Sequence, residues 1–138
     1  MCLCVTHAQE SSISDAELSL GGNYQVIRRD RPHGRGGGVC ILVRKGINFI
    51  EIAAATGDTE VVAVDFVGNE CGIRLVCCYA SPTGTTDVLR NRISAITGVL
   101  DELCACEYPI VIVGDFNLPG IFWSSVTASA LLTSKVAD

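Results

Sequence analysis

The sequence predicts an α/β fold in which layers of sheet and helix pack on one another. The first eighty residues hold short runs rich in Val, Ile, Cys and aromatic residues, separated by turns, which is the pattern of antiparallel strands. A segment with helical spacing and a strongly apolar run follow, at 85–105 and 108–114. A strand, a crossover helix and a second strand argue for sandwiched α/β layers.

Six strands are expected before the helix. They are expected at 1–6, 23–29, 39–45, 47–52, 61–67 and 73–80. The last two are joined by GNECG, whose glycine spacing fits a hairpin. Residues 11–18 carry capping-type side chains with little periodicity, which predicts a loop or one short helical turn.

The second half of the chain predicts helix, strand and helix. Thr85, Thr86 and Asp87 can cap a helix, and apolar side chains continue it at helical spacing. These side chains are Leu89, Ile93, Ile96, Leu100 and Leu103. The run YPIVIVG is apolar on both faces, which predicts a strand at the centre of a sheet covered on both sides. After GIFW, four apolar residues predict the start of another helix: Ala128, Leu131, Leu132 and Val136.

Size and composition predict one domain with a packed core. The chain has 138 residues, 49% of them hydrophobic, and a mean hydropathy of +0.40, which excludes a disordered chain. No run approaches the roughly 20 apolar residues that span a bilayer. The opening MCLCVTHAQE lacks the basic and apolar regions of a signal peptide. No membrane partner is therefore expected.

The eight cysteines predict free, buried thiols in a reducing, intracellular compartment. Four of them lie inside or beside strand-like runs: Cys40, Cys71, Cys77 and Cys78. The others form two C-x-C pairs, at 2–4 and 104–106, rather than the C-x₂-C that zinc sites favour. Only His7 and His33 could complete such a site, so structural zinc is not expected.

Polar residues follow two of the predicted strands. In GDFNLP (114–119), Asp115 and Asn117 stand two apart, so in an extended chain both side chains point the same way. Tyr79 lies at the end of another strand. A carboxylate that activates water, with an amide and a phenol that donate hydrogen bonds to phosphoryl oxygens, suits phosphodiester hydrolysis, and a divalent metal would neutralise the remaining charge. Plain turn formers and a half-buried strand-end tyrosine explain the same residues.

Four arginines form a second candidate site. The net charge of −5 does not indicate a general polyanion binder. The segment IRRDRPHGRGGG nevertheless places four arginines within eight residues: Arg28, Arg29, Arg31 and Arg35. The cluster is typical either of a solvated loop or of a patch that binds phosphates.

Several of these motifs together resemble a known superfamily. GGGVCILVRKG, LVCCYASP, the amphipathic helix and YPIVIVGDFNLPGIFW occur in this order. They resemble the endonuclease/exonuclease/phosphatase superfamily, and look most like the endonuclease domain of non-LTR retrotransposon polyproteins, which also carry a reverse transcriptase. The resemblance covers nearly the whole chain.

The resemblance implies a fold, an activity and roles for three residues. The implied fold is a four-layered α/β sandwich, present here in part. The implied activity is cleavage of DNA phosphodiesters with Mg²⁺ or Mn²⁺ in the nucleus. Asp115 matches the water-activating aspartate and would be a metal ligand, Asn117 matches the phosphate-binding asparagine, and Tyr79 matches the active-site tyrosine.

The sequence also departs from the family pattern. Thr6 stands where a metal-binding glutamate is expected, and Ala80 replaces an arginine that often follows the tyrosine. The C-terminal S-D-H segment has no counterpart before Asp138, so residues 1–138 are expected to be one C-terminally truncated domain. Asp115 alone would hold Mg²⁺ weakly, and an uncovered PIVIV strand favours self-association.

Three functions are consistent with these observations. The chain is a DNA-nicking endonuclease of retrotransposon origin, a catalytically inactive fragment of that domain, or a nucleic-acid-binding module that uses the arginine cluster. The first two share a fold and differ in activity.

Overall fold

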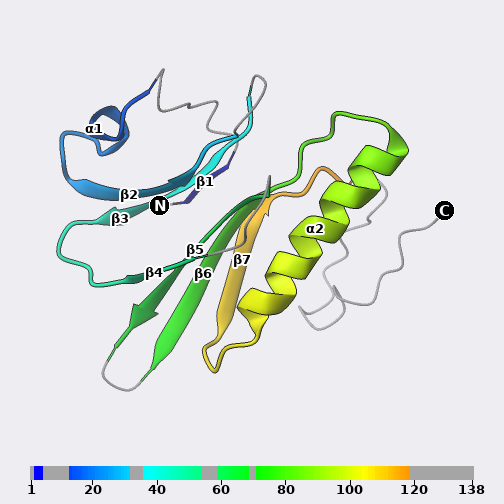
Figure 1. The fold of residues 1–138 in the computed structure, drawn as a ribbon. Coiled ribbons are helices and arrows are strands. Elements are labelled where there is room, and N and C mark those ends of the chain that lie inside the picture. The colour runs from blue at the N-terminus through cyan, green and yellow to red at the C-terminus, as the bar shows by residue number, and fades with distance from the viewer. Residues whose placement is uncertain (1, 5–12, 32–35, 54–58, 69–70, 119–138) are drawn as a thin grey trace.

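The computed structural model describes residues 2–4, 13–31, 36–53, 59–68 and 71–118 (Figure 1). Several predictions concern residues outside these ranges. They are the roles of Thr6, His7, His33 and Arg35, the GIFW segment and the helix expected from residue 128.

The described strands form two sheets (Figure 1). The first sheet has the order β1-β3-β2, with β1 at Cys2–Cys4, β2 at Tyr24–Arg29 and β3 at Val39–Arg44. The second has the order β4-β5-β6-β7, with β4 at Ile50–Ile52, β5 at Glu60–Val67, β6 at Gly72–Tyr79 and β7 at Ile110–Asp115. All pairs are antiparallel except the parallel pair β6–β7, as the strand–helix–strand pattern predicts.

Two helices complete the described fold. The short α1 spans Asp15–Leu18 and begins with a capping box formed by Ser14 and Glu17. The long α2 spans Thr86–Cys104, and the Thr85 hydroxyl accepts a hydrogen bond from the Val88 N–H. The second sheet therefore lies between the first sheet and α2 (Figure 1). The α/β prediction is confirmed.

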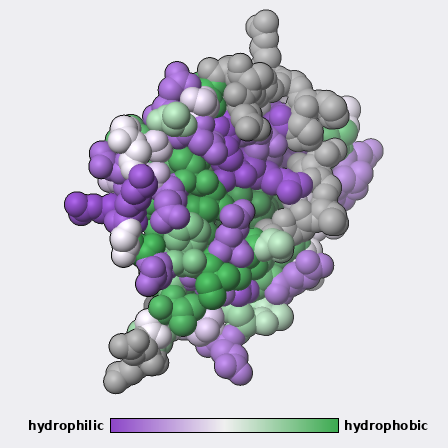
Figure 2. Space-filling view, turned by 60° about the vertical axis from the view of Figure 1, so that its left-hand side comes forward, coloured by the Kyte–Doolittle hydropathy of each residue, from purple (hydrophilic) through white to green (hydrophobic). Residues whose placement is uncertain are grey.

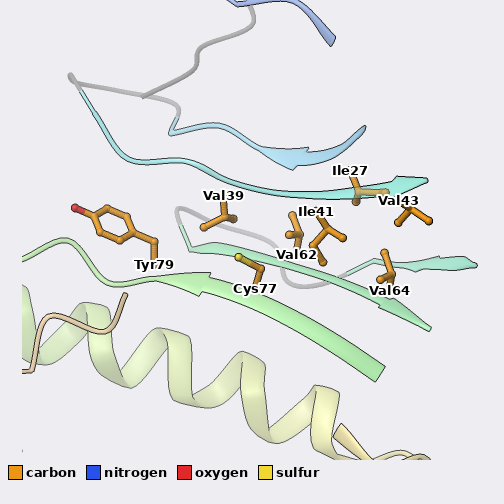
Figure 3. Packing of buried hydrophobic residues seen from close by; sticks show 8 residues of the cluster. All are labelled: Ile27, Val39, Ile41, Val43, Val62, Val64, Cys77 and Tyr79. Atoms are coloured by element: carbon orange, nitrogen blue, oxygen red, sulfur yellow. The ribbon is translucent and has the colours of Figure 1, made fainter. Parts of the chain in front are cut away.

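Apolar side chains fill both spaces between these layers. One cluster joins the two sheets, and it contains Ile27, Val39, Ile41, Val43, Val62, Val64, Cys77 and Tyr79 (Figure 3). The other joins the second sheet to α2, where Ile96, Val99 and Leu103 are buried. β3 is buried except for Arg44. β1 and β2 pair with both of its edges, and the second sheet covers the face that carries Val39, Ile41 and Val43.

The prediction that 108–114 is a strand covered on both sides is wrong for the described residues. β7 lies at the end of the sheet order, and Val111 and Ile112 are 41% and 38% exposed. Ile112 lies on the α2 face, where the cluster under α2 includes Ile110 of β7 but not Ile112. Val111 lies on the opposite face, where the cluster between the sheets includes Val113 but not Val111. An apolar run in the sequence thus predicts a strand, but it does not predict which faces of that strand other elements cover.

Two smaller predictions also need correction. The strand expected at 47–52 is ordered as a strand only at Ile50–Ile52. Among the described cysteines, Cys40, Cys77 and Cys78 are buried thiols as expected, whereas Cys71 and Cys104 are exposed. Cys71 directly precedes β6, and Cys104 is the last residue of α2.

Apolar side chains also reach the surface. Figure 2 shows apolar groups gathered in the middle of one face, with polar groups around them. Over the described ranges the exposed large apolar side chains include Ile50, Val67 and Ile73. The described helices include none that is long and apolar enough to cross a membrane.

A buried ion pair lies at the end of the second sheet that is opposite the carboxyl ends of β6 and β7. Arg74 donates from Nε and Nη2 to the two carboxylate oxygens of Asp65, at 2.7 Å each. Its Nη1 donates to the Leu103 carbonyl at 2.7 Å. The hydrogen bond to Asp65 raises the pKa of Arg74 despite its burial. One guanidinium thereby links β5 and β6 to the last turn of α2.

Arg74→Met is expected to lower the free energy of unfolding by about 3–5 kcal/mol, because it leaves the Asp65 carboxylate buried without its cation. Urea unfolding followed by circular dichroism measures this. Arg90→Met is the control, since Arg90 and Asp87 are 69% and 85% exposed and such pairs contribute about 0–1 kcal/mol. Equal effects of the two substitutions would contradict the structural role of Arg74.

Candidate functional site

A row of polar side chains crosses three strands at one end of the second sheet. Glu60 on β5 pairs with Tyr79 on β6, and Tyr79 pairs with Asp115 on β7. The next row toward the middle of the sheet, on the same face, is Val62, Cys77 and Val113. The face that packs on the first sheet therefore changes from apolar to polar at the carboxyl ends of β6 and β7, where open α/β sheets commonly bind ligands.

Asp115 is the exposed member of this row. Its carbonyl accepts a hydrogen bond of 2.9 Å from the Ala80 N–H, which extends the parallel ladder beyond Tyr79. Gly114 permits this close pairing, because a Cβ there would overlap the Cys78 carbonyl oxygen. Because residue 114 has no Cβ, the backbone at Asp115 can lie directly against the end of β6.

Asn117 reaches the same place by a turn. Its backbone N–H donates to the Asp115 Oδ1 at 3.2 Å, and its φ is +45°. Its Nδ2 donates to the Ala80 carbonyl at 3.0 Å. The strand ends at Asp115, so the expected alternation of an extended chain does not apply to Asn117. An amide NH₂ has two donors, and one of them remains for a ligand.

Tyr79 is both a core residue and a polar one. It is 7% exposed, and its ring belongs to the cluster between the sheets. Figure 3 shows its hydroxyl pointing away from the other side chains of that cluster. The Arg31 guanidinium carbon lies 5.7 Å from the centre of the ring, within the range of a cation–π contact.

Glu60, which the sequence analysis did not single out, lies at the centre of this arrangement. Its carboxylate accepts from Arg31 Nε at 3.2 Å, from Arg31 Nη2 at 2.8 Å and from the Gly38 N–H at 2.5 Å. The hydrogen bond to Glu60 raises the pKa of Arg31, although burial acts against it. A sequence signal existed, because an acidic residue at the start of a buried strand requires a partner.

The predicted arginine cluster divides in two. Arg31 joins the polar row, whereas Arg28 donates to Asp30 at 2.9 and 2.7 Å and to Asp15 at 3.1 Å. Burial acts to lower the pKa of Arg28, but its hydrogen bonds to Asp30 and Asp15 raise it overall. Arg28 and Arg29 line a cavity of about 680 Å³ between β2, β5 and α2. This cavity does not include the polar row.

The polar row offers one exposed carboxylate, that of Asp115, to a divalent cation. The described residues contain no group of three or more His, Cys, Asp or Glu side chains that could hold a metal ion. The carboxylate of Glu60 is taken by Arg31 and Gly38. Mg²⁺ is usually bound by one or two protein carboxylates together with substrate oxygens and waters.

Comparisons with known proteins identify the fold. No family model and no curated protein matches this chain. Among solved structures, the human Nocturnin catalytic domain with bound sulfate matches with a TM-score of 0.56 and 13% identity over 84% of this chain. The chain has the endonuclease/exonuclease/phosphatase fold. It covers 51% of the Nocturnin chain, so it spans about half of that length.

A second match is the inositol polyphosphate 5-phosphatase domain of spSynaptojanin, in complex with inositol (1,4)-bisphosphate and a calcium ion. The TM-score is 0.39, with 14% identity over 75% of this chain and 35% of that one. By their names these neighbours are a catalytic domain and a phosphatase. At 13% identity, the similarity to the Nocturnin catalytic domain shows the fold alone.

Gly114→Ala is expected to destabilise the protein by about 1–3 kcal/mol or more, because the new methyl group must push β7 away from Cys78. Gly98→Ala is the matched control, since a Cβ at Gly98 meets nothing within 4 Å in the middle of α2. It should stabilise the protein by roughly 0.5–1 kcal/mol. Thermal unfolding of both variants measures these opposite effects, and an unchanged stability of Gly114→Ala would contradict the close pairing.

Proposed function

We propose that this chain provides the phosphodiester-hydrolysing residues of a DNA-nicking endonuclease of retrotransposon type. The observation that carries the proposal is the convergence of Tyr79, Asp115 and Asn117 at the carboxyl ends of two parallel strands. The endonuclease/exonuclease/phosphatase fold supports it. DNA is the proposed partner, and the nucleus is the proposed location.

Each of the three side chains has a chemical role that its position permits. Asp115 is exposed, so its carboxylate can orient a water molecule and take its proton as the oxygen attacks phosphorus. The bond from phosphorus to the leaving oxygen then breaks, and that oxygen takes a proton from solvent. The Tyr79 hydroxyl and the remaining N–H of Asn117 can donate to the phosphoryl oxygens, where negative charge develops.

Mg²⁺ or Mn²⁺ is the proposed cofactor, with Asp115 as one ligand. Because the described residues form no metal cluster, further protein ligands would have to come from outside the described ranges. The alternative is that this chain is a catalytically inactive fragment of such a domain. The two possibilities differ in whether a folded chain cleaves DNA.

A binding module that uses the arginine cluster is a second alternative. Arg29 lines the cavity beside β2, and Arg28 adds a charge that Asp15 and Asp30 already balance. Affinity for DNA would then fall steeply with salt, because binding releases counterions from the phosphates.

Self-association through β7 is proposed as well, since Val111 and Ile112 are exposed on that strand.

The chain is expected to nick supercoiled plasmid in the presence of Mg²⁺ or Mn²⁺ and not in the presence of EDTA. Asp115→Asn and Asn117→Ala should each lower the rate by about 100-fold or more, as the loss of an acid–base group or of a phosphate donor does. Gel electrophoresis of relaxed and supercoiled plasmid measures the rate.

Asp101→Asn is the control, because it removes a carboxylate from the exposed side of α2. Its rate should equal that of the parent chain. If a folded parent chain does not nick plasmid with either metal, the endonuclease proposal is wrong for this chain and the inactive-fragment alternative stands.

A further inference from the structure

We propose that Arg31 and Glu60 are positioning residues that hold the Tyr79 phenol in place at the polar row. The inference rests on the proposed function, because it gives these residues a purpose through Tyr79. The proposal depends on three features: the fixed geometry of the Arg31–Glu60 pair, the glycines that make room for it, and the placement of Arg31 over the tyrosine ring.

The pair has a fixed geometry. Both oxygens of the Glu60 carboxylate accept hydrogen bonds from Arg31, at 3.2 and 2.8 Å. Such two-point pairs fix the plane of the guanidinium as well as its position. The side chains of Arg31 and Glu60 are only 19% and 5% exposed, so water screens this interaction much less than it would on the surface.

Two glycines make room for the pair. At Gly37, where φ is +89°, a Cβ would overlap the Glu60 carboxylate and the Arg31 guanidinium. Gly38 then donates its N–H to Glu60. Arg31 follows β2 and Gly38 precedes β3, so both ends of the β2–β3 connection are attached to the first residue of β5. Gly37 and Gly38 thereby form part of the site.

The pair acts on Tyr79 through the ring. Glu60 lies beside Tyr79 in the sheet register, and Arg31 lies over the ring at 5.7 Å from its centre. Interaction with the Tyr79 phenol makes a smaller contribution to the raised pKa of Arg31 than the hydrogen bond to Glu60 does. Val39 and Cys77 belong to the same apolar cluster as the ring, so the phenol contacts apolar side chains as well as the guanidinium of Arg31. Its hydroxyl is thus kept at the polar row before any substrate binds.

A mere contribution to stability would not require this arrangement. Replacing a buried ion pair by apolar residues of similar volume is often neutral or stabilising. A planar cation over the Tyr79 ring, by contrast, has no apolar equivalent. The specific consequence of the pair is therefore an orientation of the phenol, which can be observed in the absence of catalysis.

The test uses the full chain labelled with 3-fluorotyrosine and observed by ¹⁹F NMR. The three tyrosines give three signals, and Tyr79→Phe identifies the one from Tyr79. Arg31→Met should shift or broaden that signal and leave those of Tyr24 and Tyr108 unchanged. Arg31→Lys should have the same effect, because an ammonium group keeps the charge beside Glu60 but lacks the planar surface. Arg90→Met, which alters an exposed ion pair on α2, should move none of them.

An unchanged Tyr79 signal in a folded Arg31→Met or Arg31→Lys chain would overturn the proposal. Arg31→Lys retains a cation for Glu60, so it serves if Arg31→Met does not fold. Where the parent chain nicks DNA, both variants should lower kcat by on the order of ten- to a hundred-fold with little change in KM, as misplaced catalytic groups do. A parent chain that does not nick DNA refutes the proposed function, while the ¹⁹F signals still decide whether the pair positions Tyr79.

Discussion

The parallel pairing of β6 and β7 brings Tyr79, Asp115 and Asn117 to one end of the second sheet. Its register aligns Tyr79 with Asp115, and the antiparallel register of β5 adds Glu60 to the same row. A shift of one residue in β7 would turn Asp115 toward α2 and bring Gly114 to the face that packs on the first sheet. The pairing itself depends on Gly114, which lets β7 approach Cys78, and on α2, which returns the chain to the correct end of the sheet.

The two ends of this sheet are stabilised in different ways. At one end, Arg74 joins Asp65 and the last turn of α2 inside the protein. At the other end, Arg31 joins Glu60 beside an exposed carboxylate, that of Asp115. Both pairs are bidentate. The Arg74–Asp65 pair is buried, whereas Arg31 is half-buried and its pair with Glu60 lies next to groups that can meet a ligand. A structural role suffices to explain the first pair, whereas the second also determines the surroundings of Tyr79.

Much of this arrangement could be predicted from local sequence patterns. The strands before residue 81, the helix that begins at Thr86 and the parallel return through β7 follow from hydrophobic periodicity and capping residues. The meeting of Tyr79 with Asp115 follows from strand ends alone. The start of a buried strand indicates that Glu60 needs a partner, but the partners themselves could not be predicted, because Arg31 and Gly38 are 29 and 22 residues away in the chain. The exposure of Val111 and Ile112 could not be predicted either, since it depends on what packs against β7 rather than on β7 itself.

The most direct test of the account is a map of backbone amide signals by NMR while a short DNA duplex is added to the ¹⁵N-labelled chain. The account predicts that the signals of Ala80, Asp115 and Asn117 change first, because the phosphate enters at the carboxyl ends of β6 and β7. Changes confined to Arg28, Arg29 and the other residues around the cavity beside β2 would contradict it. That result would assign DNA binding to the arginine cluster and leave the polar row without a ligand.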